Sequence, residues 1–451
     1  MWVPDLTDRT GARYAALAQA IADGARSGEL PPGTRLPPQR ALAEALGVNL
    51  TTVTRAYTLA AEMGIVSGEV GRGTFIRLLP DAGRMPWPAG SQGAIDLCSN
   101  FPPPTAGAVE LAQALGPLKG AAASDLLRYQ PGGAHPAHLA AGAAWLANLG
   151  VEAPAERLLM TSGAVHGVFL SLLALCRPGD RVLTEELASP ALIGACNSLG
   201  LRAEGLAMDH DGVRPDALRQ ALSKGPARAL VLVPNLQNPT LAIMSTMRRF
   251  ELVDLLRNRE TLIVEDDAYG ALLSKAERPP PLVALAPDRT CYATSLSKAV
   301  APGLRVGFLA VPPPLRAATL GALRVSNWMT SPLLGHIAAR WIEDGTAERL
   351  AARQCEAARH RQELARRILG PFAGRGHPAA LHIWLRLPDP WRAEEFAAYT
   401  QERGVTVLPA GTMAVEAGLR PAAIRVSLCN ESEERVVSGL DILAGILAGR
   451  L

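Results

Sequence analysis

Apolar positions recur at helical spacing in the first part of the chain and then alternate. Tyr14, Leu17 and Ile21 would share one face of a helix, and a shorter helix through Leu42 and Leu46 would end at Gly47. A further helix is expected from Leu50 to Met63, followed by two alternating stretches at 64–68 and 71–76. A short helix, a tight turn and a second helix are typical of a helix-turn-helix, so the pattern predicts that motif with a two-stranded wing.

Farther along the chain, short and almost continuous apolar runs alternate with helical stretches. Residues 228–234 and 261–266 are two such runs, as expected for strands buried on both faces of a parallel sheet. Residues 331–367 indicate long helices that lead into a smaller α+β C-terminal subdomain, in which Ala423–Ser427 forms a short strand. The fold class is therefore α/β with a mostly parallel sheet. Three parts are expected: a winged helix-turn-helix at 1–77, a linker rich in Pro and Gly at 78–94, and a large domain at 95–451.

Composition narrows the class of protein without naming a function. The chain has 451 residues, of which 48% are hydrophobic and 19% charged, as in ordinary globular proteins. No apolar run is long enough for a bilayer and no signal peptide is recognisable, so we expect a cytoplasmic protein. The six Cys residues are scattered without metal-ligand spacing, which predicts neither a disulfide framework nor a metal site. A net charge of +3 does not by itself indicate nucleic-acid binding.

Lys298 is the strongest candidate for chemistry. Only four lysines occur, and the other three lie in polar or loop-like stretches. Lys298 instead stands among small hydroxyl residues, with a Pro-Gly turn and Arg305 after it. An amine nucleophile has to be partly desolvated, and anion-holding groups beside it fit a bound phosphate. A buried, paired structural lysine is the competing interpretation.

This stretch resembles a known cofactor motif. Ser-x-Ser-Lys followed by Pro-Gly-Leu-Arg-x-Gly, at 295–307, is similar to the pyridoxal-phosphate (PLP) lysine motif of fold-type I aminotransferases. The resemblance implies a PLP-dependent transferase fold, a Schiff base on Lys298, and a phosphate held by Ser295, Ser297 and Arg305.

Further positions carry the same resemblance. Asp266, at the end of a predicted strand, would hold the ring nitrogen, with Asp267 as a weaker alternative, and Tyr269 and Asn238 would contact the ring hydroxyl. Tyr129 would reach the phosphate of a partner chain. Arg425 resembles the arginine that grips a substrate carboxylate, its alternative being a strand-edge salt bridge.

Two departures from the family pattern stand out. The helix expected after Gly163 begins with Ala164 and Val165, where relatives often carry a hydroxyl residue and Gln, so only backbone contacts to the phosphate remain there. Ser189 occupies the position at which an aromatic residue usually stacks on the cofactor ring. Both changes weigh against efficient transamination. His166 is a candidate to fill part of the gap, or else a packing residue.

The first segment resembles the winged helix-turn-helix of the GntR family almost continuously from Tyr14 to Ile76. The resemblance carries over six DNA-contacting positions: Arg40, Asn49, Thr51, Thr52, Thr54 and Arg72. Leu50 stands where some relatives have a base-reading Arg, which implies a different operator.

Together the two segments resemble the MocR subfamily of bacterial transcriptional regulators. That resemblance implies a PLP-dependent DNA-binding regulator that senses an amino compound or PLP itself, and a head-to-tail homodimer. Two alternatives stay open: an active aminotransferase with an N-terminal cap or dimerisation domain, and a DNA-binding protein whose large domain no longer binds the cofactor.

Overall fold

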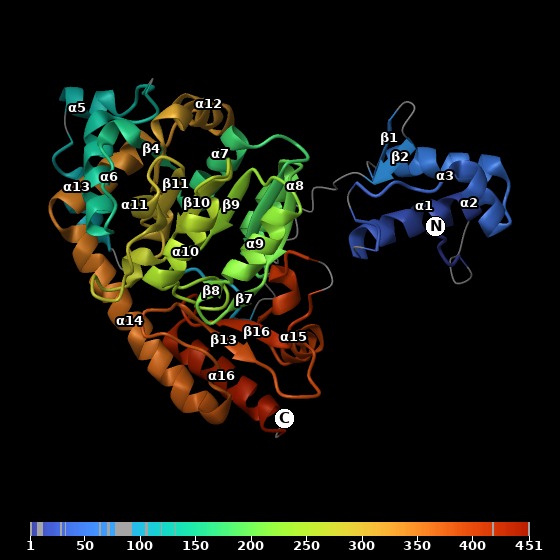
Figure 1. Ribbon diagram of the computed structural model, residues 1–451. Coiled ribbons are helices and arrows are strands. Elements are labelled where there is room, and N and C mark those ends of the chain that lie inside the picture. The colour runs from blue at the N-terminus through green and yellow to red at the C-terminus, as the bar shows by residue number, and fades with distance from the viewer. Residues whose placement is uncertain are drawn as a thin grey trace. The chain divides into compact units, whose positions relative to one another are not determined.

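A computed structural model describes most of the chain and divides it into two compact units. The described residues are 2–6, 12–27, 29–31, 33–62, 65–69, 73–76, 93–103, 107–118, 120–130, 132–416 and 419–449. The units are Met1–Gly83 and Arg84–Leu451, and Figure 1 shows the elements of each.

The first unit is a three-helix cluster with a small hairpin. Its elements are α1 (Arg13–Ser27), α2 (Gln39–Leu46), α3 (Leu50–Glu62), and the antiparallel pair β1 (Val66–Glu69) and β2 (Gly73–Ile76). Gly47 ends α2 with φ at 62°, a left-handed conformation that glycine adopts without steric cost. Leu17, Leu42 and Val53, one from each helix, are completely buried in a shared core. The predicted helix-turn-helix and hairpin are thereby confirmed.

A seven-stranded sheet forms the centre of the second unit. Its spatial order is β4 (Leu158–Thr161), β12 (Gly307–Ala310), β11 (Thr290–Ser295), β10 (Leu262–Asp267), β9 (Ala229–Leu232), β5 (Arg181–Glu185) and β6 (Arg202–Leu206). Only β12 runs antiparallel to its neighbours. Along β10, Ile263 and Val264 enter different core clusters. Because successive side chains point to opposite, equally covered faces, these strands are continuously apolar.

Helices cover both faces of this sheet (Figure 1). α7 packs directly on β10, β11 and β12, so the strand ends that carry Asp266 and Lys298 lie close to its amino end. The helices of the second unit that precede α14 are α4 (Ala108–Leu115), α5 (Gly120–Asp125), α6 (Pro136–Asn148), α7 (Ala164–Leu175), α8 (Pro190–Ser198), α9 (Pro215–Ser223), α10 (Thr246–Leu256), α11 (Leu282–Leu285), α12 (Arg316–Ser326) and α13 (Pro332–Glu343).

A smaller α+β subdomain follows the long helix α14 (Thr346–Leu369). It contains the antiparallel sheet β13 (His382–Arg386), β16 (Ala423–Ser427), β15 (Leu408–Pro409), with α15 (Ala393–Glu402) and α16 (Glu433–Leu447). β3 (Ile95–Asp96) pairs in parallel with β14 (Val405–Thr406), so the start of the second unit is built into this subdomain. The subdomain is therefore not purely C-terminal. Leu97, beside β3, is completely buried in its core.

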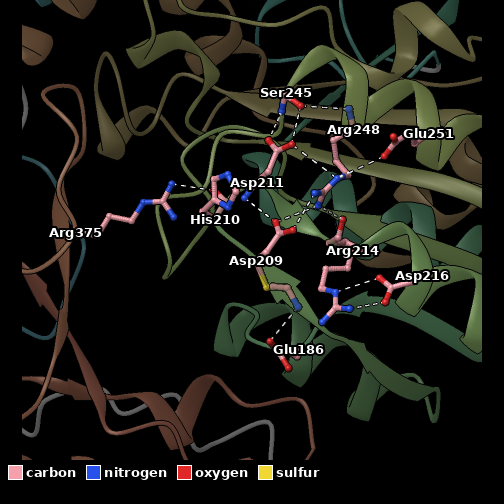
Figure 2. A network of polar contacts seen from close by, with 12 residues as sticks. Glu186, Asp209, His210, Asp211, Arg214, Asp216, Ser245, Arg248, Glu251 and Arg375 are labelled. Carbon is pink, nitrogen blue, oxygen red and sulfur yellow. Dashed lines mark hydrogen bonds and ion pairs between the residues drawn. The ribbon is translucent and has the colours of Figure 1, made fainter.

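A polar network ties a short hairpin to the rest of the unit (Figure 2). β7 (Met208–Asp209) and β8 (Gly212–Val213) form the hairpin. Arg248 on α10 donates to both carboxylate oxygens of Asp209, at 3.1 and 2.9 Å, and Asp211 accepts from the backbone and hydroxyl of Ser245 at the start of α10. From the smaller subdomain, Arg375 donates to the His210 carbonyl at 2.9 Å. The hairpin thus joins α10 to the segment before β13.

Candidate functional site

Lys298 lies in the turn that follows β11. The strand ends at Ser295, and Leu296 donates its backbone N–H to the Val306 carbonyl, which folds the turn back toward β12. The Lys298 Nζ donates to the Asn100 carbonyl at 2.6 Å. Its ammonium group has no carboxylate partner among the described ion pairs. The contacts therefore do not support the competing interpretation, in which Lys298 is a structural lysine in a buried ion pair.

The environment of Lys298 favours the neutral amine. Burial is the main cause, with Arg425 and Arg305 acting in the same direction and Cys429 opposing, and together they lower the pKa of Lys298 to about 8. An unshared electron pair on the amine is the condition for attack on a carbonyl group. Lys298 therefore loses its proton more easily than an exposed lysine, and its neutral amine, the nucleophilic form, predominates above about pH 8.

A cavity of about 180 Å³ surrounds Lys298. Its wall includes Asp266 and Tyr269 from the end of β10, Asn238 from the loop after β9, and Arg425 from β16. Elements far apart in the sequence thus deliver an amine, a carboxyl group, a phenol and a guanidinium to one space. Most of the remaining wall is apolar, from Phe101, Val165, Pro190, Ala191, Val233, Ala268 and Leu408.

The two neighbouring aspartates at the end of β10 have different surroundings. Asp266 lines the cavity, and burial raises the pKa of its carboxyl group to about 7. Asp267 points instead into the core, where it accepts from Asn235 at 2.8 Å and from the Tyr292 hydroxyl at 2.5 Å. The geometry favours Asp266 over Asp267 as the group that would hold a proton facing the cavity.

Arg425 is held by neutral acceptors. Its Nη1 donates to Asn238 Oδ1 at 2.9 Å and its Nη2 to the Cys98 carbonyl at 2.6 Å. Its Nε is buried and has no partner within the described residues. A positive charge without an acid partner, with a spare donor, is suited to an incoming carboxylate. The contacts described for Arg425 do not include the strand-edge salt bridge that was the alternative.

An anion-binding corner lies where β4 leads into α7. Arg305 donates to the Ser297 hydroxyl at 3.2 Å and to the Ser162 carbonyl at 2.8 Å. Gly163 precedes the helix with φ at 99°, and a Cβ on it would lie 2.9 Å from the Arg305 Nη2, so the close approach requires glycine. Ser295 is buried and its hydroxyl accepts from the Ser297 N–H at 3.4 Å. The corner combines hydroxyls, a guanidinium and helix-start amides.

The helix start supplies little from its side chains. Ala164 is buried and offers no polar group, and Val165 projects into the cavity described above. His166 accepts from the Ser162 N–H at 3.0 Å and contacts the Ser326 hydroxyl at 3.0 Å, which describes a packing and positioning residue. Ser189 caps α8 by accepting from the Leu192 N–H at 3.3 Å. It also lines the cavity, so this position presents a small hydroxyl side chain there and not an aromatic ring.

Tyr129 is not brought to the cavity of its own chain. Its side chain is 74% exposed and packs edge-to-face on Trp328, with ring centroids 5.9 Å apart. Leu127, close to Tyr129 in sequence, and Val325, close to Trp328, are also strongly exposed. This exposed apolar surface is compatible with contact between Tyr129 and a partner chain. Tyr129 does not line the cavity around Lys298 of its own chain.

Several site residues escaped the sequence analysis. Asn100 accepts from Lys298 through its carbonyl and donates from its amide to the Tyr269 hydroxyl at 3.2 Å. Phe101 lies with its ring centroid 5.7 Å from the Lys298 Nζ, and buried His382 contacts the Asn100 amide. Nothing local marks these positions, because their partners lie more than 160 residues away in the chain.

The candidate DNA-contacting residues lie on α2, the turn and α3. Arg40, Asn49, Thr51 and Thr54 are exposed, Thr52 is half-buried, and the Thr54 hydroxyl donates to Gln39 Oε1 at 2.7 Å. Asn49 stands just before α3, and its carbonyl accepts from the backbone N–H groups of Thr52 and Val53. Arg72, predicted at the wing tip, lies outside the described residues. Thr51 and Thr54 lie at the start of α3, the second helix of the motif, which enters the major groove in such domains, whereas Arg40 lies on the first helix.

The described residues offer neither a metal site nor a membrane-spanning helix. No group of three or more His, Cys, Asp or Glu side chains there is arranged to hold a metal ion. None of the helices described is long and apolar enough to cross a membrane.

Comparisons with known proteins identify both units. Residues 92–443 match the family "Aminotransferase class I and II", and residues 13–76 match "Bacterial regulatory proteins, gntR family". The class I and II aminotransferase fold is PLP-dependent.

Individual relatives have the same arrangement of parts. The uncharacterized HTH-type transcriptional regulator YdeF of Bacillus subtilis is 29% identical over 99% of this chain and 96% of its own length. The vitamin B6 salvage pathway transcriptional repressor PtsJ of Salmonella typhimurium is 28% identical over 88% of this chain and 90% of its own.

Among solved structures, an archaeal alanine:glyoxylate aminotransferase superposes with a TM-score of 0.73 at 25% identity, covering 79% of this chain and 91% of the other. The chain therefore belongs to the aminotransferase class I and II family and, with its GntR-family N-terminal domain, is a transcriptional regulator of the MocR type.

Proposed function

We propose that this chain binds pyridoxal 5'-phosphate at Lys298 and adjusts its binding to operator DNA when an amino compound, or the cofactor itself, occupies the cavity. The observation that carries the proposal is the convergence of Lys298, Asp266 and Arg425 on one cavity. When bound, the cofactor supplies an aldehyde that condenses with amines and a ring that accepts electrons.

The residues present fit this cofactor. Arg305, Ser297 and Ser295, with the amide groups of Ala164 and Val165, make an anion-binding corner of the kind a phosphate needs. Gly163 supports the fit, since its φ of 99° at the start of the helix is a conformation that residues with side chains rarely adopt.

The ring would be oriented by polar groups of the cavity wall. Asp266 would face the ring nitrogen and share a proton with it. Burial raises the pKa of its carboxyl group to about 7, and a positively charged ring nitrogen would oppose that rise. Tyr269 and Asn238 would face the ring hydroxyl. Lys298 would provide the amine that joins the cofactor to the chain.

Arg425 supports a carboxylate-bearing amine as the sensed molecule. Its buried guanidinium contacts neutral acceptors and has an unused Nε. An effector carboxylate at Arg425 places the amine on the Lys298 side of the cavity. The effector shifts the protein only if it binds one arrangement of the two units more tightly than another.

Operator binding is assigned to the N-terminal unit. Arg40, Asn49, Thr51, Thr52 and Thr54 are the proposed contacts, joined by Arg72 on the wing. We assign residues 1–77 to the winged helix-turn-helix, 78–94 to the linker and 95–451 to the large domain. A head-to-tail homodimer would present two such units to two half-sites and would bring Tyr129 of one chain to the phosphate of the other; the exposure of Tyr129 supports this.

The absorption spectrum of the purified protein tests the cofactor assignment. With added PLP, the wild type should acquire a band in the near-ultraviolet to visible range that borohydride abolishes, and Lys298→Ala should lack it. A protein that takes up no cofactor sinks this proposal and leaves a DNA-binding protein with a retired domain.

A turnover assay then separates sensing from enzyme activity. The same loaded protein is mixed with amino donors and keto acids while operator binding is measured by mobility shift. Rapid turnover without any specific shift would favour the alternative, an active aminotransferase with an N-terminal cap.

A further inference from the structure

A second cavity lies apart from Lys298, at the junction of α6 and α14. Its volume is about 370 Å³, roughly twice that of the cavity around Lys298, and it shares no wall residue with it. Small-molecule sites in proteins are typically about 300–1,000 Å³. The wall comes from α6, the segment 271–278, α14 and residues 377–379, so both subdomains contribute.

The floor of this cavity is apolar. Trp145 and Leu149 enter from the end of α6, Leu272 and Leu273 from the segment after β10, and Ala351 from α14, all of them buried. Such a floor favours a hydrocarbon or aromatic body of a ligand through removal of apolar surface from water.

Donors around the cavity outnumber the acceptors available to them. The Trp145 indole N–H is buried and has no hydrogen-bond partner within the described part of the chain. Within the described residues, Arg278 donates to the carbonyls of Gly270, Asn148 and Leu273, and no ion pair is described for it. Two of its five N–H groups have no described acceptor. Arg359 on α14 is exposed at the rim. No ion pair within 4 Å is described for it, although its charge helps to lower the pKa of Glu277 in the same wall.

The acidic groups of the wall are already satisfied. Glu277 accepts from the N–H and hydroxyl of Ser274, and that side-chain hydrogen bond, first among several causes, lowers the pKa of its carboxyl group. Glu348 accepts from the Asn148 amide at 2.6 Å. Burial lowers the pKa of His377, so its ring is neutral near pH 7. Among the described residues, the groups of this wall that lack an acceptor are the Trp145 indole N–H and two N–H groups of Arg278, so the cavity is short of hydrogen-bond acceptors.

We propose that this cavity is a second binding site, for a small monocarboxylate with an apolar body. The body would lie on the floor formed by Trp145 and Leu272, and the carboxylate would face Arg359 and Arg278. Because α14 packs against α13 on one side and α16 on the other, an occupant would stabilise one relation between the two subdomains. The site thus offers an input separate from the cofactor cavity.

Isothermal titration of the PLP-saturated full-length protein tests the proposal, with hexanoate as the probe and hexanamide as its neutral isostere. We expect saturable hexanoate binding and about tenfold weaker binding of hexanamide, since a charge-assisted hydrogen bond is lost. Arg359→Ala should weaken hexanoate about tenfold, whereas Arg367→Ala, on the same helix but outside the cavity, should not. Equal binding of the two probes, or an unchanged affinity in Arg359→Ala, would overturn the carboxylate site.

A second variant locates the probe. Ala352→Trp, at an exposed wall position, should fill the space and abolish hexanoate binding while the melting temperature and the PLP spectrum stay close to wild type. If hexanoate still binds this variant but no longer binds Arg425→Ala, it occupies the cofactor cavity and the second site is refuted. If Ala352→Trp does not fold, the comparison of Arg359→Ala with Arg367→Ala decides.

Discussion

Burial sets the protonation of Lys298, and that has a measurable consequence for cofactor uptake. Its pKa of about 8 lies below the ordinary value, so the neutral amine increases as pH rises toward 8 and is dominant above it. The rate at which PLP reacts with the cofactor-free protein should rise about tenfold per pH unit below 8 and level off above. A rate that keeps rising through pH 10, as for an exposed lysine derivative used as control, would contradict a desolvated Lys298.

Ser189 offers a second prediction at the residue scale. Because its hydroxyl only caps α8, replacing it by Tyr should add a ring beside the cofactor and tighten PLP binding by roughly 2- to 10-fold, from an aromatic contact of about 0.5–1.5 kcal/mol. Ser189→Ala removes the cap without adding a ring and is the control. PLP titration followed by absorbance measures both. Equal affinities of the two variants would show that position 189 does not face the ring.

Individual residues also show what a sequence can and cannot reveal. Lys298, Asp266 and Arg425 were identified because each stands in a short pattern that is readable without the fold, and the structure places all three at one cavity. Asn100 was missed because its partners, Lys298 and Tyr269, come from distant elements. The choice between Asp266 and Asp267 needed the directions of the side chains, which alternate along a strand whose two faces are both buried.

The helix-turn-helix makes a prediction at the element scale. Arg40 is exposed on α2, in the first helix of the motif, so Arg40→Ala should weaken operator binding without changing the melting temperature. Loss of one phosphate contact should reduce the slope of log affinity against log salt by about one. Fluorescence anisotropy at several salt concentrations measures it. An Arg40→Ala variant with full affinity and an unchanged salt slope would count against the proposed interface.

The polar network of Figure 2 leads to a second prediction at the element scale. Arg248 makes two hydrogen bonds to Asp209 and one of 2.8 Å to the Val213 carbonyl, so it closes the β7–β8 hairpin onto α10. Arg248→Ala should lower the free energy of unfolding by about 1–3 kcal/mol, because partly buried acceptors lose their donors. Arg257→Ala, on an exposed pair with Asp254, should change it by less than about 0.5 kcal/mol. Chemical denaturation compares them, and equal losses would show that the network does not stabilise the hairpin.

Elements with strong local signals were predicted well. Periodicity and Gly47 located α2 and α3, and the apolar runs located β9 and β10 to within a residue or two. Strand order was not predicted, because the pairing of β12 between β4 and β11 depends on contacts far apart in the chain. The two-residue strands, such as β3, are too short to produce any pattern.

At the scale of the whole molecule, the smaller subdomain is assembled from two ends of the second unit. β3 pairs with β14, and Arg435 on α16 donates to the Ala94 carbonyl, so the residues that follow the linker are anchored in the subdomain that also carries Arg425. Motion of that subdomain around an effector would consequently displace the attachment point of the linker.

Operator affinity measured with and without ligands tests the central claim most directly. A DNA fragment from upstream of the gene would be titrated with wild-type protein and with Lys298→Ala, each without cofactor, with PLP, and with PLP plus a panel of amino acids. We expect PLP or an amino acid to change the affinity of the wild type at least fivefold, as coupling free energies of about 1 kcal/mol or more require, and to leave Lys298→Ala unchanged. Specific binding of the same affinity under all conditions, in a wild type that visibly carries PLP, would contradict a sensing role for this cavity.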